Sequence, residues 1–407
     1  MRKIAIVGAG QVGLHLGIGL VRRGYDVRIL TNRTAEQIST GRVLSSQAML
    51  GPALDLERAD GLELWESDAP PIEGIHFTWL DEDGAPVTRF SVRRARPALS
   101  VDQRVKMPRW MDLFEQSGGS LEVVDADAAA VEQLTETADL VIIAAGKGEI
   151  SALFPADAAR TEFSTPQRHL ALAYVTGVDA PTSFDGNDFG KRDGVGEMFM
   201  FPALTTSGPC HIVTVEAVPD GPLDVFAPDQ TAGDLVDQLR ATADQLFPWL
   251  GERLVNARPT DTQSTLVGRF APTRRCPAAT LDNGATVLAA GDVVALNDPL
   301  TGQGANNAAR CAALYVDRIS RRGAAPFDPA WMRETGDQFA SSIEASTRWT
   351  NATLRPWPDH VRRQLIAAAT NPAQASRFAE GFGNPDAIWA DWQRTATATR
   401  ERCDADA

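Results

Sequence analysis

The fold of this chain is decided by the stretch Gly8-Ala9-Gly10-Gln11-Val12-Gly13, which follows the apolar run Ile4–Val7. That run is short and rich in β-branched residues, as buried parallel strands are. A helical pattern continues from Val12 to Arg23, and Tyr25–Thr31 has the pattern of the next strand. This order predicts one βαβ unit.

The glycines of this turn suit the binding of a dinucleotide. Gly8 permits the tight turn, Gly10 lets the backbone approach a pyrophosphate, and Gly13 lets the helix pack closely on the strand. The start of the helix presents free N–H groups and the positive end of its dipole. We therefore predict a nucleotide site at Gly8, Gly10, Gln11 and Gly13, in preference to a turn without a ligand.

The next strand ends without the acid that commonly binds the adenosine ribose. Asn32 stands at that position, and Arg33 follows it. Either Arg33 receives the 2′-phosphate of NADP, or the site binds FAD without this anchor and releases it more readily. The first glycine turn is compatible with both.

A second motif favours FAD. Gly291-Asp292 ends a predicted strand, and Asp298-Pro299-Leu300-Thr301-Gly302-Gln303-Gly304-Ala305-Asn306 runs directly into a helix. An acid at a strand end can bind ribityl hydroxyls, and a helix N-terminus can face the flavin edge that becomes negative on reduction. The predicted flavin-binding residues here are Asp292, Pro299, Gly302, Gly304, Ala305 and Asn306.

Together these motifs resemble those of the group E flavoprotein monooxygenases, the styrene and indole enzymes. The stretches Thr347-Arg348-Trp349-Thr350-Asn351, Val101-Asp102-Gln103-Arg104 and Gly146-Lys147 also resemble that group. The resemblance extends from Met1 to about Trp392.

The resemblance implies a two-component system in which a separate NADH-dependent flavin reductase delivers reduced FAD. Reaction with O2 would give a C4a-hydroperoxide that oxygenates an aryl alkene, indole or aryl sulfide. Residue by residue, Arg42, Arg104 and Gly146 would lie against the cofactor. Ser45-Ser46-Gln47 departs from the asparagine that the styrene enzymes carry near the flavin, so these three residues are candidates for a changed substrate.

The residues that suit a substrate pocket are apolar. On the strand Glu197–Phe201, alternation places the two methionines on one face and the two phenylalanines on the other. One of these two faces is expected to line the cavity. Such residues are also typical of a core. Without a nearby cluster of Arg or Lys, we expect a small, neutral aromatic substrate. The predicted pocket residues are Phe77, Trp79, Met198, Met200, Phe201 and Pro202.

We predict an α/β protein with a Rossmann-type FAD-binding domain, an inserted antiparallel-sheet substrate domain and a helical C-terminal region. The FAD-binding domain is discontinuous, 1–160 with 270–320, and the substrate domain covers 161–269. From 321 to 407 the chain is predicted to be helical, with breaks at Pro326, Pro356, Pro372 and Pro385.

The charge and cysteine content of the chain limit the kinds of binding partner that we expect. A net charge of −14 with dispersed acids disfavours nucleic acid. The cysteines Cys210, Cys276, Cys311 and Cys403 are far apart, which indicates reduced thiols in a cytoplasmic protein, and the histidines have no metal spacing. No apolar stretch is long enough to span a membrane. A homodimer is left open.

Two other functions compete with this prediction. A single-component hydroxylase would bind NAD(P)H itself and carries an Asp-Gly segment after its second glycine-ended strand, where this chain has Lys147–Ser151 without Asp-Gly. A flavin or nucleotide binder without catalysis would not need a substrate domain.

Overall fold

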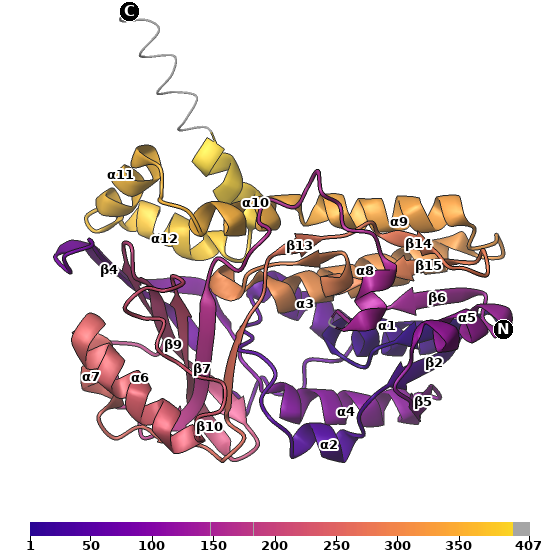
Figure 1. The fold of residues 1–407 in the computed structure, drawn as a ribbon, viewed down its shortest axis with the longest axis horizontal. Helices are drawn as coiled ribbons and strands as arrows, with labels where there is room; N and C mark the ends of the chain where they lie inside the picture. The colour runs from indigo at the N-terminus through magenta and orange to yellow at the C-terminus, as the bar shows by residue number, and fades with distance from the viewer. Residues whose placement is uncertain (147, 182, 394–407) are drawn as a thin grey trace, which may run out of the picture.

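The computed structural model describes residues 1–146, 148–181 and 183–393, and its two main sheets lie beside each other (Figure 1). The first sheet has the order β14-β15-β6-β1-β2-β5, and all its neighbours are parallel except β14 and β15. Its strands are β1 (Lys3–Val7), β2 (Asp26–Thr31), β5 (Ser120–Val123), β6 (Leu140–Ile143), β14 (Ala278–Thr280) and β15 (Thr286–Ala289).

Helix α1 (Gln11–Val21) connects β1 to β2, so the predicted βαβ unit is confirmed. The apolar side chains of this half form one core with the sheet. The other helices of this half are α2 (Ala35–Ser39), α3 (Gly51–Ala59), α4 (Gln103–Gln116), α5 (Ala128–Thr137), α8 (Gln303–Arg322) and α9 (Pro329–Ser342).

The second sheet has the order β11-β7-β10-β9-β8-β3-β4, with β12 also paired to β7. It is antiparallel except where β3 meets β8. Its strands are β3 (Ile72–Leu80), β4 (Pro86–Ala98), β7 (His169–Thr176), β8 (Asn187–Arg192), β9 (Gly196–Thr205), β10 (Gly208–Ala217), β11 (Arg258–Pro259) and β12 (Thr265–Arg269). A separate pair joins β13 (Thr273–Arg274) to β16 (Ala295–Leu296).

Helices cover both faces of the second sheet. One face packs on α6 (Ala232–Leu246) and α7 (Pro248–Leu254), and the other packs on the C-terminal helices (Figure 1). These are α10 (Glu344–Thr353), α11 (Asp359–Ala368) and α12 (Pro372–Gly381), and the four predicted prolines lie between or at the ends of helices. The predicted α/β fold class is confirmed.

The structure differs from the prediction in two places. The amphipathic sequence pattern from Thr231 to Leu250 predicts one helix, but the structure divides it into α6 and α7, because the backbone leaves helical geometry at Phe247 and Pro248 starts a new helix. Strands β3 and β4 were not predicted; they lie within the range 1–160 but belong to the second sheet. The domain boundaries themselves stay a prediction.

Candidate functional site

The strand ends of the first sheet bring the glycine motifs together. Strands β15, β6, β1 and β2 are parallel neighbours, so Asp292, Gly146, Gly8 and Asn32 all follow carboxyl ends at one edge. A Cβ added to Gly146 would lie 2.6 Å from the Cβ of Asp292. Two motifs that are far apart in the sequence therefore share one crevice edge, where ligands of such folds bind. Lys147 lies outside the described residues.

The turn between β1 and α1 has the shape that a pyrophosphate site requires. Gly8 has φ of +115°, and a Cβ on Gly13 would lie 1.9 Å from the carbonyl oxygen of Gly8. Neither position accepts a side chain in this backbone. At Gly10, by contrast, a Cβ would meet no atom of the described residues within 4 Å. The start of α1 thus packs closely against β1, and the Cβ direction of Gly10 is open within the described chain. This arrangement fits a bound dinucleotide.

The start of α8 is similarly open. Gly302 precedes this helix in a left-handed conformation, with φ of +66°, and no side chain caps the helix. Within the part of the chain that the structure describes, a Cβ on Gly302 or Gly304 would meet no atom within 4 Å. Free N–H groups and the positive dipole end therefore face space that a flavin can fill. Asn297, just before this loop, is buried, and neither its amide nitrogen nor its oxygen has a partner among the described residues.

Two predicted cofactor residues are fully engaged with the protein instead. Asn306 donates to the carbonyls of Ala48 (2.9 Å) and Gly302 (2.7 Å) and accepts from the backbone N–H of Leu50 (2.9 Å). The Arg104 guanidinium bonds Asp102, Asp261, Thr205 and the carbonyl of Gly41. These bonds use all the N–H donors of both side chains. Each residue therefore holds neighbouring segments of the site in place and has no side-chain N–H group left for a cofactor.

The remaining predicted contacts near the cofactor are placed as follows. Arg42 and Asn32 are exposed, and Arg33 is half-buried. Gln103 donates to the hydroxyl of Ser45 (3.0 Å) and to the side-chain oxygen of Gln47 (3.3 Å). Ser45 and Gln47 are therefore held inside a network, whereas Ser46 lines a cavity.

This cavity lies between the loop before α8 and the second sheet, is partly open to solvent, and has a volume of about 50 Å3. Pro299 to Gly302 form one wall, and aromatic residues of β9 form another. Its lining is mostly apolar and comes from Ser46, Ala48, Leu50, Ile72, Arg94, Ala98, Asn187, Phe199, Phe201, Pro299, Leu300, Thr301, Gly302 and Phe382.

Of the predicted pocket residues, only Phe201 lines this cavity. Met198 and Met200 point to the opposite face of β9, where they pack in the core under α6, and alternation places Pro202 with them. Phe77 and Trp79 are completely buried in the core of the other face. The methionines therefore do not line this cavity, and the alternation predicted for this strand is confirmed.

The chain is similar to several known proteins. Residues 146–253 match the family model described as "Styrene monooxygenase A putative substrate binding domain". The chain is 28% identical to the styrene monooxygenase StyA of Pseudomonas fluorescens over 398 residues, which cover 95% of this chain and 94% of that protein. A StyA from a Pseudomonas species matches with the same identity and coverage.

The chain resembles the styrene monooxygenases over nearly its whole length. It is an FAD-dependent monooxygenase, which uses a flavin and oxygen. Solved structures share the fold: a variant of the flavin-dependent brominase Bmp2 has a TM-score of 0.67 at 16% identity, covering 98% of this chain and 99% of that one. PqsL of P. aeruginosa has a TM-score of 0.65 at 14% identity, covering 91% and 99%.

Behind the α8 loop of this monooxygenase lies a buried cluster of charges that the sequence did not indicate. Glu216 is completely buried and its carboxyl contacts that of Asp298, the residue whose side chain caps Leu300. Burial and the Asp298 carboxyl raise the pKa of Glu216 well above its usual value. Burial also raises the pKa of Asp298. Two carboxyls in contact in a dry site favour sharing a proton.

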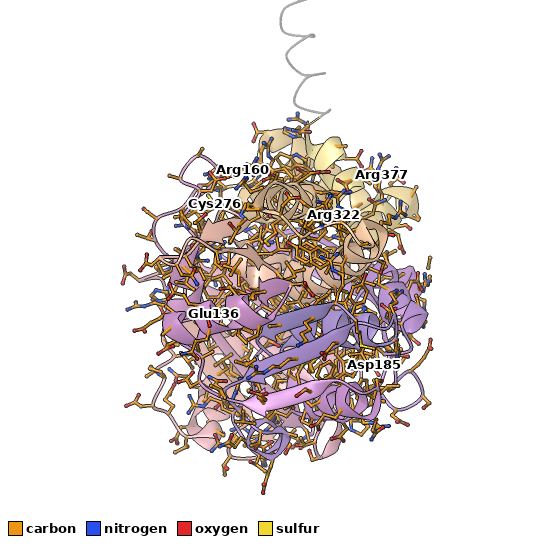
Figure 2. The ribbon with its side chains drawn as sticks, turned by 90° about the vertical axis from the view of Figure 1, so that its right-hand side faces the viewer. Glu136, Arg160, Asp185, Cys276, Arg322 and Arg377 are labelled. Carbon is orange, nitrogen blue, oxygen red and sulfur yellow. The ribbon has the colours of Figure 1, made fainter. Side chains whose placement is uncertain are left out.

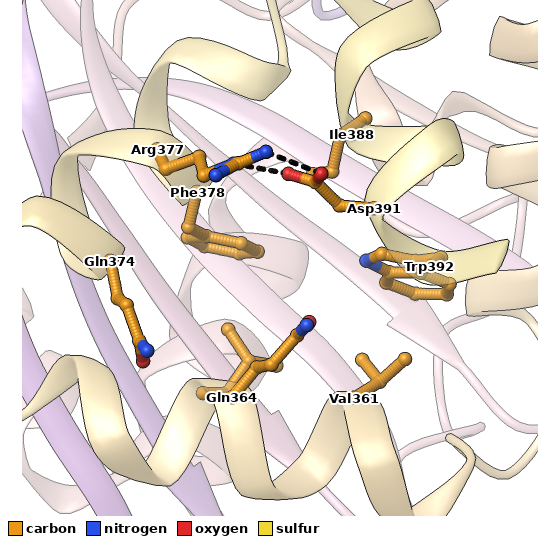
Figure 3. Close-up of a pocket in the computed structure, with 9 residues that line it drawn as sticks. Val361, Gln364, Gln374, Arg377, Phe378, Ile388, Asp391 and Trp392 are labelled. Carbon is orange, nitrogen blue, oxygen red and sulfur yellow. Dashed lines mark hydrogen bonds and ion pairs between the residues drawn. The ribbon is translucent and has the colours of Figure 1, made fainter. Parts of the chain in front are cut away.

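A second cavity lies among the C-terminal helices (Figure 3). Its lining comes from α11, α12 and the segment up to Trp392, and Arg377 forms an ion pair with Asp391 at its edge. None of its lining residues belongs to the glycine motifs. We therefore do not include it in the flavin site.

The cysteine side chains differ in their exposure to solvent. Cys210 and Cys311 are buried free thiols, and Cys276, labelled in Figure 2, is a partly exposed one. Cys403 lies outside the described residues. In the part of the chain that the structure describes, no helix is both long and apolar enough to cross a membrane.

Proposed function

We propose that this monooxygenase is the oxygenase component of a two-component system and receives reduced FAD from a separate NADH-dependent flavin reductase. The sequence holds one Gly-x-Gly-x-x-Gly turn, so no second turn of this kind offers a site to NADH. The exposed Asn32 at the end of β2 provides no carboxylate for the ribose, which favours a cofactor that arrives and leaves. Buried free thiols agree with a cytoplasmic protein.

The reaction that this site fits is the addition of one oxygen atom to an electron-rich aromatic compound. Bound reduced flavin supplies two electrons to O2, so that one oxygen atom enters the substrate and the other leaves as water. The acceptor is an aryl alkene, the C2–C3 bond of an indole, or the sulfur of an aryl sulfide. The protein's part is to hold the acceptor close and to exclude water.

One observation carries this proposal: the wall from Pro299 to Gly302 is common to the cavity and to the open start of α8. A flat aromatic ring between Phe199, Phe201 and Leu300 would lie beside the same loop that faces the flavin space. Burying such a ring contributes about 25 cal/mol per Å2 of apolar surface.

The proposal is tested with purified protein and a separately purified flavin reductase. Alone, the protein should oxidise neither NADH nor NADPH. With reductase, FAD and NADH, it should convert indole to indigo precursors and thioanisole to its sulfoxide, whereas reductase alone should not. Rapid NAD(P)H oxidation by the lone protein would instead favour a single-component hydroxylase.

A further inference from the structure

The cavity beside the α8 loop contains one cationic side chain, Arg94 of β4. Arg94 lines the cavity together with Phe199 and Phe201, and its side chain contacts Ala379 and Phe382, so it lies on the face of the second sheet that carries these two phenylalanines. That face packs against the C-terminal helices and is otherwise lined by aromatic rings. The cavity lining thus includes one arginine, although it includes no cluster of Arg or Lys of the kind whose absence led us to expect a neutral substrate.

The charge of Arg94 is only partly matched by the protein. Its Nη1 donates to the carbonyl of Ala379 near the end of α12, and its Cζ lies 5.4 Å from the ring centre of Phe382. Its Nε is buried and has no acceptor, and no carboxylate within the described residues forms an ion pair with it. The nearby Glu380 carboxylate accepts instead from the backbone N–H of Ala95 (2.7 Å).

Arg94 remains a cation at neutral pH. Burial lowers the pKa of its guanidinium to about 10, while the charge of Glu380 acts in the opposite direction. Removing a charge from water without a partner costs several kcal/mol. The bond to Ala379 fixes the group against α12 and leaves other N–H donors for a ligand.

A second polar side chain stands on the same face. Asn187, the first residue of β8, lies opposite Ile75 of β3 and lines the cavity with Arg94. Its side-chain oxygen, which can only accept, is buried without a partner among the described residues, so the group of Asn187 that can donate to a carboxylate is its amide nitrogen, Nδ2. Thr301, in contrast, is already engaged with Thr350 at 2.5 Å.

We propose that the substrate is an aromatic compound that carries a carboxylate, and that Arg94 binds this carboxylate with Asn187 beside it. The aromatic part lies against Phe199, Phe201 and Leu300, so that its oxygen-accepting atom faces the loop from Pro299 to Gly302. Arg94 is thus a specificity-determining residue. This inference rests on the proposed function, because it assigns the substrate class of the same cavity.

The test compares two sulfides that differ in one group, thioanisole and 4-(methylsulfanyl)benzoate, with reductase, FAD and NADH. Wild-type protein should oxygenate the carboxylate with the higher kcat/KM. Arg94→Gln should lower the carboxylate-to-thioanisole ratio of kcat/KM by about 10- to 100-fold, in line with the loss of one charge-assisted bond pair. Arg94→Lys, which keeps the charge, should retain part of the preference.

Arg93→Gln is the matched control. Arg93 is the adjacent residue on the opposite face of β4, where it is exposed and pairs with Glu73, so this change should leave the ratio as in wild type. If Arg94→Gln does not fold, as judged by its thermal melt, Asn187→Leu should lower the same ratio.

The two claims fail in different ways. A wild-type preference for thioanisole, or an equal effect of Arg94→Gln on both sulfides, would overturn the carboxylate assignment while oxygenation continues. If neither sulfide is oxygenated, the proposed function fails. Calorimetric binding of the two sulfides to the FAD-loaded protein then still decides the role of Arg94: the carboxylate should bind more tightly, and equal affinities would overturn the assignment.

Discussion

Arg104 and Asp261 are joined by two hydrogen bonds, of 3.1 and 3.0 Å, which connect the start of α4 to the loop before β12. The same guanidinium reaches the carbonyl of Gly41, next to Arg42. Arg104 therefore links helix α4, which packs on the first sheet, to the loop before β12 of the second sheet and to the segment from Gly41 that leads to Ser46 in the cavity wall.

We expect Asp261→Asn to lower the free energy of unfolding by about 1–3 kcal/mol, because it removes a charge partner from a buried arginine. Urea denaturation measures the effect. Asp237→Asn breaks an exposed ion pair with Arg240 and serves as the control, with an expected loss below about 1 kcal/mol. Equal losses in the two variants would contradict the role assigned to Arg104.

Glu216→Gln should change how stability depends on pH. The pKa of Glu216 is raised in the folded protein, so the folded state binds more protons than the unfolded state above the usual glutamate pKa. Stability from this group is therefore lost as the pH rises towards the folded pKa. Glutamine cannot lose a proton, and its amide can donate to Asp298.

The free energy of unfolding of Glu216→Gln should thus exceed that of wild type by a margin that grows as the pH rises above the usual glutamate pKa. Glu334→Gln, at an exposed ion pair with Arg318, should show no such trend. A constant difference between Glu216→Gln and wild type over the same rise in pH would rule out a shared proton at Asp298.

Gly302→Val should abolish the binding of both oxidised and reduced FAD, because a branched side chain would occupy the open space at the start of α8. Gly284→Val is a matched control: Gly284 also has a positive φ and an open Cβ direction, but it lies in the turn between β14 and β15. Both changes strain the backbone by about 1–2 kcal/mol. Fluorescence titration with FAD should separate them, and normal binding by Gly302→Val would refute this loop as the flavin site.

Reduced FAD should bind at least about tenfold more tightly than oxidised FAD. The reduced ring is anionic and, bound as proposed, would face the positive end of α8, which has no acidic residue in its first turn. Anaerobic titration of both redox states gives the comparison. Equal affinities would show that the helix does not discriminate between them.

The parts of the fold that were predictable from sequence depend on local signals. The turn from Gly8 to Gly13 and the loop from Asp298 to Asn306 combine apolar runs with glycines whose geometry only this arrangement requires. Strand β4 gave no such signal, because its Thr-Arg-Phe-Ser-Val-Arg-Arg sequence includes charged residues and it lies at the sheet edge.

The residues of the candidate site were predictable only where they lie within one continuous sequence motif. Alternation in β9 separates Met200 from Phe201, but which face meets the cavity depends on α6 and α12, distant in sequence. The position of Arg94 depends on pairing with β3 and on Ala379, 285 residues further along the chain. Likewise, Asn306 resembles a flavin ligand in sequence, and only the structure shows that Ala48 and Leu50 already occupy its amide.

The central claim is that this chain oxygenates a substrate with reduced FAD that another protein has prepared. The most direct measurement is a single turnover: the protein is mixed anaerobically with photoreduced FAD and an aryl sulfide, without reductase or nicotinamide, and then exposed to O2. We predict sulfoxide in an amount approaching that of the protein, and none with Gly302→Val. The claim would be contradicted if sulfoxide formed only when NADH or NADPH was also present and bound to this chain.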